Sequence, residues 1–543
     1  MAMPKLIIMS SWLLIFPAII SVAGTVSRAT TVPFELHASS PCQFTRFPGL
    51  CAESLSGLPS QNQYVDFVSA LINKTISASN LPVSNFESLS YHFISEEAQN
   101  TRKAIGDCRE LMNMAVKRLN QALVAIKQSP TKNKEDIQTW LSAALTYQET
   151  CKDIANVHAT SNSFMQEISK KMDYLSQMGS NPLTLVNRIT AENSKNTGPH
   201  TSIKGRGLVE QQNFPTWISA RDRKLLQATT IQANAVVAKD GSGNYKTISE
   251  AIRAAGGGRF VIYVKAGVYN EKIHCNKDGI TLVGDGKYST VITGSSSVAG
   301  GSSLQDSATV TITGDGFIAK DIGFQNTAGP NGDQAVAVLI ASDRAVLYRC
   351  TLAGYQDTLY ALSLRQFYRE CDIYGTVDFI FGNAAAVFQN CNLVLRRPRS
   401  RVAYNVILAN GRSDPGQNTG FSLQNCGIIP GSDFSPVKNS FNSYLGRPWK
   451  VYSRAVVMQS TIDGAITSRG WIEWPGAPSS SLRTLYFAEY GNMGPGAGTS
   501  GRVRWPGYHV IAIDEAEKYT VGNFIAGTSW IPSTGVAFVS GLS

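Results

Sequence analysis

A short segment centred on a cysteine recurs along the second half of the chain, and this repeat constrains the fold more than any other feature. Each copy contains one short apolar strand, and the copies lie at residues 348–352, 369–373, 389–393 and 424–428. The first three cysteines, Cys350, Cys371 and Cys391, are 21 and 20 residues apart. A period in the low twenties predicts the coils of a parallel β-helix. Residues one coil apart then stack about 4.7–4.9 Å apart, so Cys371 could bond either with Cys350 or with Cys391.

The same period brings two acids and two amides together. Asp357 and Asp378 are 21 residues apart, and Gln334 precedes Gln356 by 22. Two neighbouring carboxylates do not both ionise at low cost, so one pKa should rise while the other stays low. Such a pair supplies a proton donor and a nucleophile or base, and stacked amides can donate to an oxyanion. The alternative is that both aspartates are turn residues whose carboxylates are satisfied by backbone amides.

Aromatic and basic residues near these positions extend the hypothesis. Tyr355, Phe379 and Phe381 flank the two acids and should exclude water from them. Arg447 could hold a carboxylate by a bidentate pair, and Trp449 offers a flat face for stacking on a sugar ring. In isolation, a buried tryptophan beside a surface arginine explains the last two residues as well.

Other catalytic machinery is missing from the sequence. No Gly-x-Ser-x-Gly motif occurs, and of the six histidines only His274 and His509 lie in the strand-rich half, away from the acids. A serine triad is therefore not expected. No Cys-x-x-Cys motif or His/Cys cluster occurs either, so zinc is not expected.

The first half of the chain has a helical period instead. Apolar residues recur near every 3.6 positions at Ile105, Cys108, Leu111, Met112, Ala115, Leu119 and Leu123, and again at Ile137, Trp140, Leu141, Ala144, Tyr147 and Cys151. Each stripe carries one cysteine, so a Cys108–Cys151 bond could join two packed helices. Cys42 and Cys51 are nine residues apart and suit a short hairpin. We expect a small helical bundle over residues 40–185.

The N-terminus predicts a secreted protein. Lys5 precedes an apolar run that ends at Ala23, with small residues before Gly24, as in a signal peptide covering residues 1–23. A retained membrane anchor is the alternative. In the secretory route Asn73 becomes a glycosylation acceptor, and most of the nine cysteines should pair.

Residues 186–230 have the composition of a linker, rich in Asn, Ser, Lys, Gly and Gln. They contain the basic segment Arg223-Lys224-Leu225-Leu226, which we interpret as a site for a processing protease; a solvated charge run is the alternative. The net charge of +10 suits a polyanionic partner. The basic residues are scattered and carry no nucleic-acid-binding motif, so an acidic polysaccharide is favoured over nucleic acid.

Together these segments resemble the plant pectin methylesterases (pectinesterases), in the form that carries an inhibitor-like pro-region. The matching motifs are residues 267–271, 334–338, 354–359, 378–382 and 445–449, within residues 231–543. The resemblance implies an all-β right-handed parallel β-helix preceded by an all-α, four-helix-bundle-like pro-domain. It also implies hydrolysis of galacturonate methyl esters in cell-wall pectin, with release of methanol and without a cofactor. The pro-domain would act as an inhibitor of its own chain, with assistance to folding or targeting to the wall as the alternatives, and a monomer is expected.

The resemblance also implies a role for each candidate residue. Asp378 matches the nucleophile, and Asp357 matches the acid that protonates methanol and then the base that activates water. Gln356 matches the oxyanion stabiliser, and Gln334 binds substrate and assists.

Three further assignments come from the same resemblance. Arg447 matches the residue that orients the nucleophile and the sugar, Trp449 the stacking platform, and the family pattern favours a Cys371–Cys391 disulfide. The sequence departs from the family at residues 302–305, Ser-Ser-Leu-Gln, where Trp-Thr-Thr-Phe is usual. Leu304 then replaces a threonine that contacts substrate, so we expect altered substrate subsites.

Two competing functions remain at this point. A pectin lyase or glycosidase also uses a β-helix, and a glycosidase also needs two carboxyl groups. A non-catalytic reading combines an esterase inhibitor with a wall-binding module. The paired glutamines with Arg447 and Trp449 favour ester cleavage over the first, and the intact aspartates argue against the second.

Overall fold

The computed structural model describes residues 41–58, 63–81, 96–159, 162–190, 232–400 and 403–543. The predicted signal peptide, most of the predicted linker and the predicted processing site lie outside the described residues. In the described part of the chain, no helix is long and apolar enough to cross a membrane.

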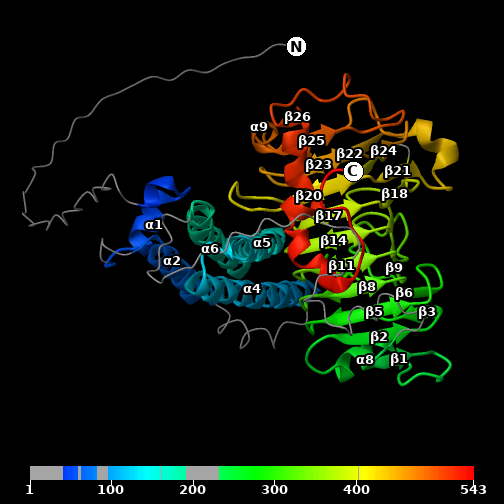
Figure 1. Ribbon diagram of the computed structural model, residues 1–543, viewed down its shortest axis with the longest axis horizontal. Coiled ribbons are helices and arrows are strands. Elements are labelled where there is room, and N and C mark those ends of the chain that lie inside the picture. The colour runs from blue at the N-terminus through cyan, green and yellow to red at the C-terminus, as the bar shows by residue number, and fades with distance from the viewer. Residues whose placement is uncertain (1–40, 59–62, 82–95, 160–161, 191–231, 401–402) are drawn as a thin grey trace, which may run out of the picture.

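The N-terminal domain is a bundle of helices, shown blue to cyan in Figure 1. Its elements are η1 (Pro41–Phe44), α1 (Pro48–Ser54), α2 (Tyr64–Ala78), α4 (Glu96–Gln128), α5 (Lys134–His158) and α6 (Ser163–Asn187). The four long helices pack on one another, and the predicted stripes of α4 and α5 supply much of the buried core. A disulfide between Cys108 and Cys151 joins α4 to α5, and one between Cys42 and Cys51 joins η1 to α1.

The C-terminal domain is a β-helix built from three sheets in which all strand pairs are parallel. The first sheet contains β1 (Ala235–Val237), β2 (Phe260–Val264), β5 (Ile280–Gly284), β8 (Ile318–Lys320), β11 (Ala345–Tyr348), β14 (Arg365–Arg369), β17 (Ala385–Gln389), β20 (Gly420–Gln424), β23 (Arg454–Met458), β25 (Tyr486–Tyr490) and β26 (Tyr508–Val510). The second contains β4 (Ile273–Cys275), β7 (Val310–Ile312), β10 (Val338–Ile340), β13 (Leu359–Ala361), β16 (Ile380–Gly382), β19 (Asn405–Asn410) and β22 (Ser443–Pro448). The third contains β3 (Gly267–Asn270), β6 (Thr290–Gly294), β9 (Gly323–Asn326), β12 (Thr351–Ala353), β15 (Asp372–Gly375), β18 (Asn392–Leu395), β21 (Gly427–Pro430) and β24 (Thr461–Ile462). The solenoid predicted from the repeat is confirmed.

Short helices cover the end and one side of the β-helix. They are α8 (Ile248–Ala254), η2 (Ser435–Ser440), α9 (Ser481–Thr484), α10 (Ile513–Ala516), η3 (Glu517–Tyr519), α11 (Val521–Phe524), η4 (Gly527–Ser529) and η5 (Ile531–Thr534). α8 begins with a capping box between Thr247 and Glu250 and packs against β1 and β2. The C-terminal turns, red in Figure 1, run along the first sheet, where Val521 and Trp530 join Phe367 in one apolar cluster.

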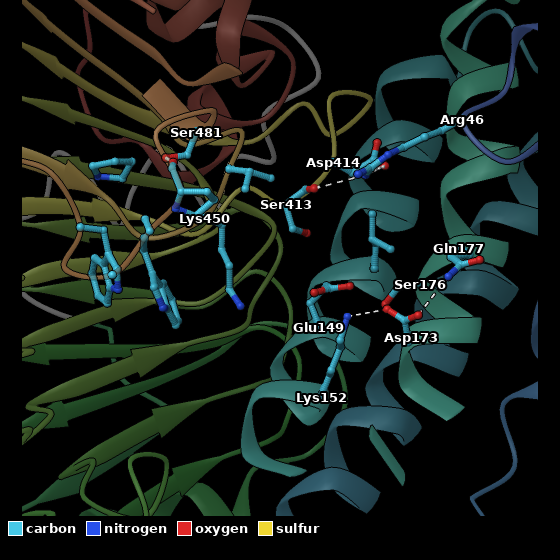
Figure 2. A pocket seen from close by; sticks show the side chains of 18 of the residues that line it. Arg46, Glu149, Lys152, Asp173, Ser176, Gln177, Ser413, Asp414, Lys450 and Ser481 are labelled. Carbon is cyan, nitrogen blue, oxygen red and sulfur yellow. Dashed lines mark hydrogen bonds and ion pairs between the residues drawn. The ribbon is translucent and has the colours of Figure 1, made fainter. Parts of the chain in front are cut away.

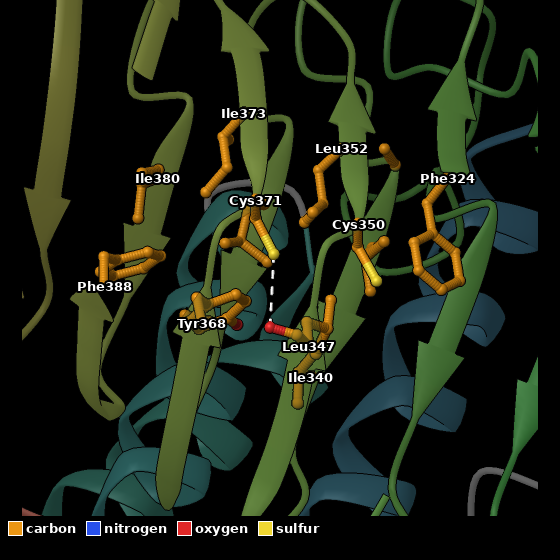
Figure 3. Packing of buried hydrophobic residues seen from close by; sticks show 14 of the residues in the cluster. Phe324, Ile340, Leu347, Cys350, Leu352, Tyr368, Cys371, Ile373, Ile380 and Phe388 are labelled. Carbon is orange, nitrogen blue, oxygen red and sulfur yellow. Dashed lines mark hydrogen bonds between the residues drawn. The ribbon is translucent and has the colours of Figure 1, made fainter. Parts of the chain in front are cut away.

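The recurring cysteines form a buried ladder inside the β-helix, of which Figure 3 shows Cys350 and Cys371. Cys350, Cys371, Cys391 and Cys426 precede β12, β15, β18 and β21, and all four are free thiols, as is Cys275. The predicted Cys371–Cys391 bond was therefore wrong. Three of the thiols instead lie against a backbone carbonyl of the preceding coil: Cys371 Sγ is 3.3 Å from the oxygen of Leu347, Cys391 Sγ is 3.5 Å from that of Tyr368, and Cys426 Sγ is 3.3 Å from that of Phe388.

The helical bundle packs on the outer face of the second sheet. Leu339, Tyr360, Phe381 and Ala409 belong to successive strands of this sheet and share one buried apolar cluster with the helices. They lie in register, since Leu339 pairs with Tyr360, Tyr360 with Phe381, and Phe381 with Ala409. The second sheet is therefore covered by the helical domain in this chain.

Ion pairs surround this apolar contact. Arg118 of α4 donates hydrogen bonds of 2.7 and 2.8 Å to Asp315 in the β-helical domain. Asp136 of α5 forms an ion pair of 2.6 Å with Arg365. These ion pairs thus help to fix how the two domains are oriented on each other, in addition to the apolar packing between them.

Candidate active site

The coil register gives Asp357 and Asp378 equivalent positions. Each acid stands two residues before a strand of the second sheet, and the first residues of those strands, Leu359 and Ile380, pair with each other. The backbone amide of Asp357 donates a hydrogen bond to the carbonyl of Val377, so the backbone pairing of the two coils extends to the acids. Both aspartates adopt a left-handed backbone, with φ of 61° and 48°. Asp and Asn tolerate this conformation better than most residues, so the tight turn itself favours this residue type.

A cavity of about 580 Å³ lies over the two acids, within the roughly 300–1,000 Å³ range of pockets that hold small ligands. All six predicted catalytic and substrate-binding residues line it: Gln334, Gln356, Asp357, Asp378, Arg447 and Trp449. The helical domain contributes the other wall through α4 and α5, including Asp107 and Asp153. The active-site candidate is therefore partly enclosed by the N-terminal domain.

Arg447 on β22 is bonded to one of the two acids. Its Nε lies 2.8 Å from Asp378 Oδ1 and 3.1 Å from Oδ2, and its Nη2 lies 2.5 Å from Oδ2. Tyr404 accepts a hydrogen bond of 3.0 Å from Nη1, and the guanidinium carbon lies 4.3 Å from the ring centroid of Trp474. These contacts fix the guanidinium plane, so Arg447 holds Asp378 in one orientation.

Burial and charge distinguish the two acids. Burial raises the pKa of Asp357 well above its usual range, and the neighbouring charge of Asp378 raises it further. Burial also raises the pKa of Asp378, but the charge and hydrogen bonds of Arg447 oppose this effect. These surroundings favour the negative charge of the pair on Asp378 and the proton on Asp357.

Only part of the expected aromatic shell reaches the acids. Phe381 lines the cavity and stacks on Tyr360, with ring centroids 4.2 Å apart. Phe379 stands between the left-handed turn at Asp378 and the first residue of β16, and its ring packs inside the β-helix. Tyr355 lies beside Arg396, whose guanidinium carbon is 3.7 Å from its ring centroid, and does not line the cavity. The expectation that Phe379 and Tyr355 exclude water from the acids was wrong.

Some residues of the site had not been identified from the sequence. Tyr404 and Trp474 hold Arg447, but neither stands at a repeating position. Lys450 follows Trp449 and pairs with Asp153 of the helical domain at 2.5 Å. Leu304, singled out as a departure from the family pattern, does line the cavity.

The described residues contain no group of three or more His, Cys, Asp and Glu side chains placed to hold a metal ion. What the site contains is two neighbouring acids, an arginine bonded to one of them, two amides and aromatic walls. Acids and amides gathered in the groove of a parallel β-helix are typical of a hydrolytic enzyme.

Comparisons with known proteins agree with this class. Residues 234–528 match the family described as pectinesterase, and residues 38–185 match the plant invertase/pectin methylesterase inhibitor family. The chain is 46% identical to probable pectinesterase/pectinesterase inhibitor 54 of Arabidopsis thaliana over 94% of each chain. It is 49% identical to pectinesterase 2 of Citrus sinensis over 82% of this chain and 83% of that one. Among solved structures, the pectin methylesterase from carrot is 51% identical, with a TM-score of 0.57, and covers 58% of this chain and 100% of its own. The chain therefore belongs to the pectinesterase family, and it is a carboxylic ester hydrolase with an inhibitor-like helical domain.

Proposed function

We propose that the β-helical domain hydrolyses methyl esters of galacturonate units in pectin by dividing the chemistry between Asp378 and Asp357. The observation that carries this proposal is the asymmetry of the pair: Arg447 donates three hydrogen bonds to Asp378 and leaves Asp357 to hold the proton. An ionised carboxylate next to a carboxylic acid is what a covalent acyl transfer with a departing alcohol requires.

In the first step the Asp378 carboxylate attacks the carbonyl carbon of the methyl ester. The carbonyl oxygen becomes an oxyanion, for which the amides of Gln356 and Gln334 are the proposed donors. As the tetrahedral centre collapses, the bond to the methoxy group breaks, and Asp357 gives its proton to the departing methanol. The galacturonate acyl group is then joined to Asp378 as an anhydride, and Asp357 is ionised.

In the second step Asp357 acts as a base. It takes a proton from a water molecule, whose oxygen attacks the acyl carbon, and the bond to Asp378 breaks. The galacturonate leaves as an acid, and the pair returns to its starting state with one proton and one charge. Trp449 at the cavity wall is the proposed platform for the sugar ring.

The matched substitutions Asp378→Asn and Asp321→Asn test this mechanism. Asp321 is also left-handed, with φ of 54°, and Arg349 also bonds both of its carboxylate oxygens, at 2.6 Å each, but it does not line the cavity. We expect Asp378→Asn to lower methanol release from methylated pectin at least about a thousandfold, and Asp321→Asn to leave it within about twofold.

Methanol and chain length should be measured in the same samples, with thermal unfolding as a check of the fold. Methanol without shorter chains is expected. Chain shortening without methanol would instead indicate a glycosidase or lyase, and full activity in a folded Asp378→Asn variant would remove this residue from its role.

We further propose that the helical domain inhibits its own chain. α4 and α5 form one wall of the cavity over the acids and would exclude a polymer from it. Four predictions from the sequence accompany this proposal: secretion to the cell wall, cleavage at residues 223–226, glycosylation at Asn73 and a monomeric state. Asn73 is an exposed residue of α2 in the structure.

A further inference from the structure

Lys450 lies on the groove beside the catalytic cavity. It directly follows β22 and Trp449, and its Nζ is 5.9 Å from the centroid of the Trp449 ring. It lines a second cavity, of about 590 Å³, between the two domains. Figure 2 shows Lys450 on the β-helical side of this cavity and Glu149 and Lys152 on the helical side. Trp449 and Trp474 line both cavities, so the second cavity continues the groove past the catalytic acids.

The partner of Lys450 is a carboxylate that belongs to the helical domain. Asp153 of α5 forms an ion pair of 2.5 Å with it, and Asp153 also lines the catalytic cavity. Among the described residues, Lys450 has no ion pair with a carboxylate of its own domain. Separation of the helical domain therefore leaves a lysine facing the groove without a counter-charge.

The other two cations of the second cavity, Lys152 and Arg46, belong to the helical domain. Lys152 is bonded to Asp173 at 2.5 Å within the helical domain, and Arg46 pairs with Asp414 at 3.2 Å. Lys450 is thus the cation of this cavity that stays with the β-helical domain and loses its partner when the helical domain leaves.

We propose that Lys450 binds the free carboxylate of a galacturonate unit next to the one whose ester reacts, and that Asp153 occupies this site in the full chain. The inference rests on the proposed function, because it assumes a galacturonate polymer in the groove. A lysine ammonium beside a stacking tryptophan matches a sugar ring that carries a carboxylate. A methyl ester at the same position offers no charge. The enzyme should therefore prefer esters that neighbour a unit already de-esterified.

The substitutions Lys450→Met and Lys438→Met test this site in the β-helical domain, residues 231–543. The carrot structure, matched over its whole length, indicates that a chain of this extent folds alone. Lys438 is the matched control, because it pairs with Asp463 at 2.7 Å at a similar exposure but lines neither cavity. The substrates are two pectins of equal length, one fully methylated and one partly de-esterified.

We expect Lys450→Met to lower kcat/KM about tenfold on the partly de-esterified pectin, through KM, with less than about a twofold change on the fully methylated one. Lys438→Met should change neither. Equal losses on both pectins, or no loss on either, would overturn the proposal.

Inhibition by a short unesterified oligogalacturonate gives a second readout. Its inhibition constant should rise about tenfold in Lys450→Met and stay unchanged in Lys438→Met. Calorimetric binding of the same oligomer does not depend on turnover. If the domain releases no methanol but binds the oligomer through Lys450, only the proposed function is refuted. If it releases methanol and binds the oligomer equally well without Lys450, only this inference is refuted.

Discussion

Asp357 and Asp378 differ in what surrounds them although they occupy equivalent positions in successive coils. Arg447 comes from β22 and reaches Asp378, held in place by Tyr404 and Trp474. Asp357 has no bonded cation among the described residues and lies beside the charge of its neighbour. One arginine thus gives two equivalent positions of a repeat different electrostatic surroundings.

The raised pKa of Asp357 predicts a pH-dependent cost in stability. Below its ordinary pKa of 3.8 this carboxyl is protonated in both the folded and the unfolded state. Above that value the unfolded state releases the proton while the folded state keeps it, so the free energy of unfolding falls until the pH passes the folded pKa. An Asp357→Asn variant lacks this titration, and asparagine suits the left-handed backbone.

We therefore expect Asp357→Asn to become progressively more stable than wild type as the pH rises above about 4, in chemical denaturation of the β-helical domain. Asp321→Asn serves again as the control, since it should not reproduce this trend. A stability difference that is constant with pH would show that Asp357 titrates normally.

At the scale of elements, the regular coils were predictable from the sequence and the longer loops were not. The 21-residue step from Asp357 to Asp378 follows from three short strands joined by short turns. The next step is longer: Asn392 of β18 pairs with Gly427 of β21, 35 residues on. Tyr404 lies in one of the loops that lengthen this coil. Its contact with Arg447 depends on the path of that loop, for which the sequence offers no period.

The cysteine ladder shows a second limit of the same kind. The spacing correctly predicted that Cys371 and Cys391 stack one coil apart in the interior. The spacing does not predict the direction of each sulfur, and in the structure both sulfurs face a carbonyl of the preceding coil. Stacking brings residues within bonding range, but side-chain direction decides whether a bond forms.

The contact between α4 and the β-helix should depend on pH through Asp107. Burial, together with the charges of Asp306 and Glu110, raises its pKa to about 6 from 3.8, while a hydrogen bond from Ser303 and the charge of Lys272 oppose the rise. In a separated helical domain this carboxyl would face water, so association takes up a proton. The resulting stabilisation is fully present below about pH 4 and is lost as the pH rises through about 6.

We expect the affinity between the separated domains to fall by roughly tenfold to a hundredfold from pH 4 to pH 7, measured by calorimetry or surface binding. An Asp107→Asn substitution should remove most of this change. An unchanged pH profile in Asp107→Asn would assign the effect to other groups.

At the scale of the whole molecule, the helical domain covers the active site, and none of its described residues bonds to the two acids. Its contacts surround them: Asp136 with Arg365, Arg118 with Asp315, and Asp153 with Lys450. The ion pair between Arg447 and Asp378 is present in the chain with its helical domain in place. Inhibition in the full chain should therefore act on access and not on the chemistry.

Access control predicts selectivity by substrate length. The cavity of about 580 Å³ can hold a short methylated oligogalacturonide, whereas a polymer would have to pass through α4 and α5. We expect the full chain to match the separated β-helical domain within about threefold in kcat/KM on the oligomer, but to be at least about tenfold slower on pectin. Equal losses on both substrates would mean that the helical domain disturbs the acids themselves.

The central claim, that a protonated Asp357 lies beside an ionised Asp378, can be measured directly by infrared difference spectroscopy of the β-helical domain. A protonated carboxyl should persist well above pH 3.8, vanish in Asp357→Asn, and titrate at lower pH in Asp378→Asn, where the neighbouring charge is gone. Two carboxyls that both ionise near pH 3.8, each unaffected by substitution of the other, would contradict the account.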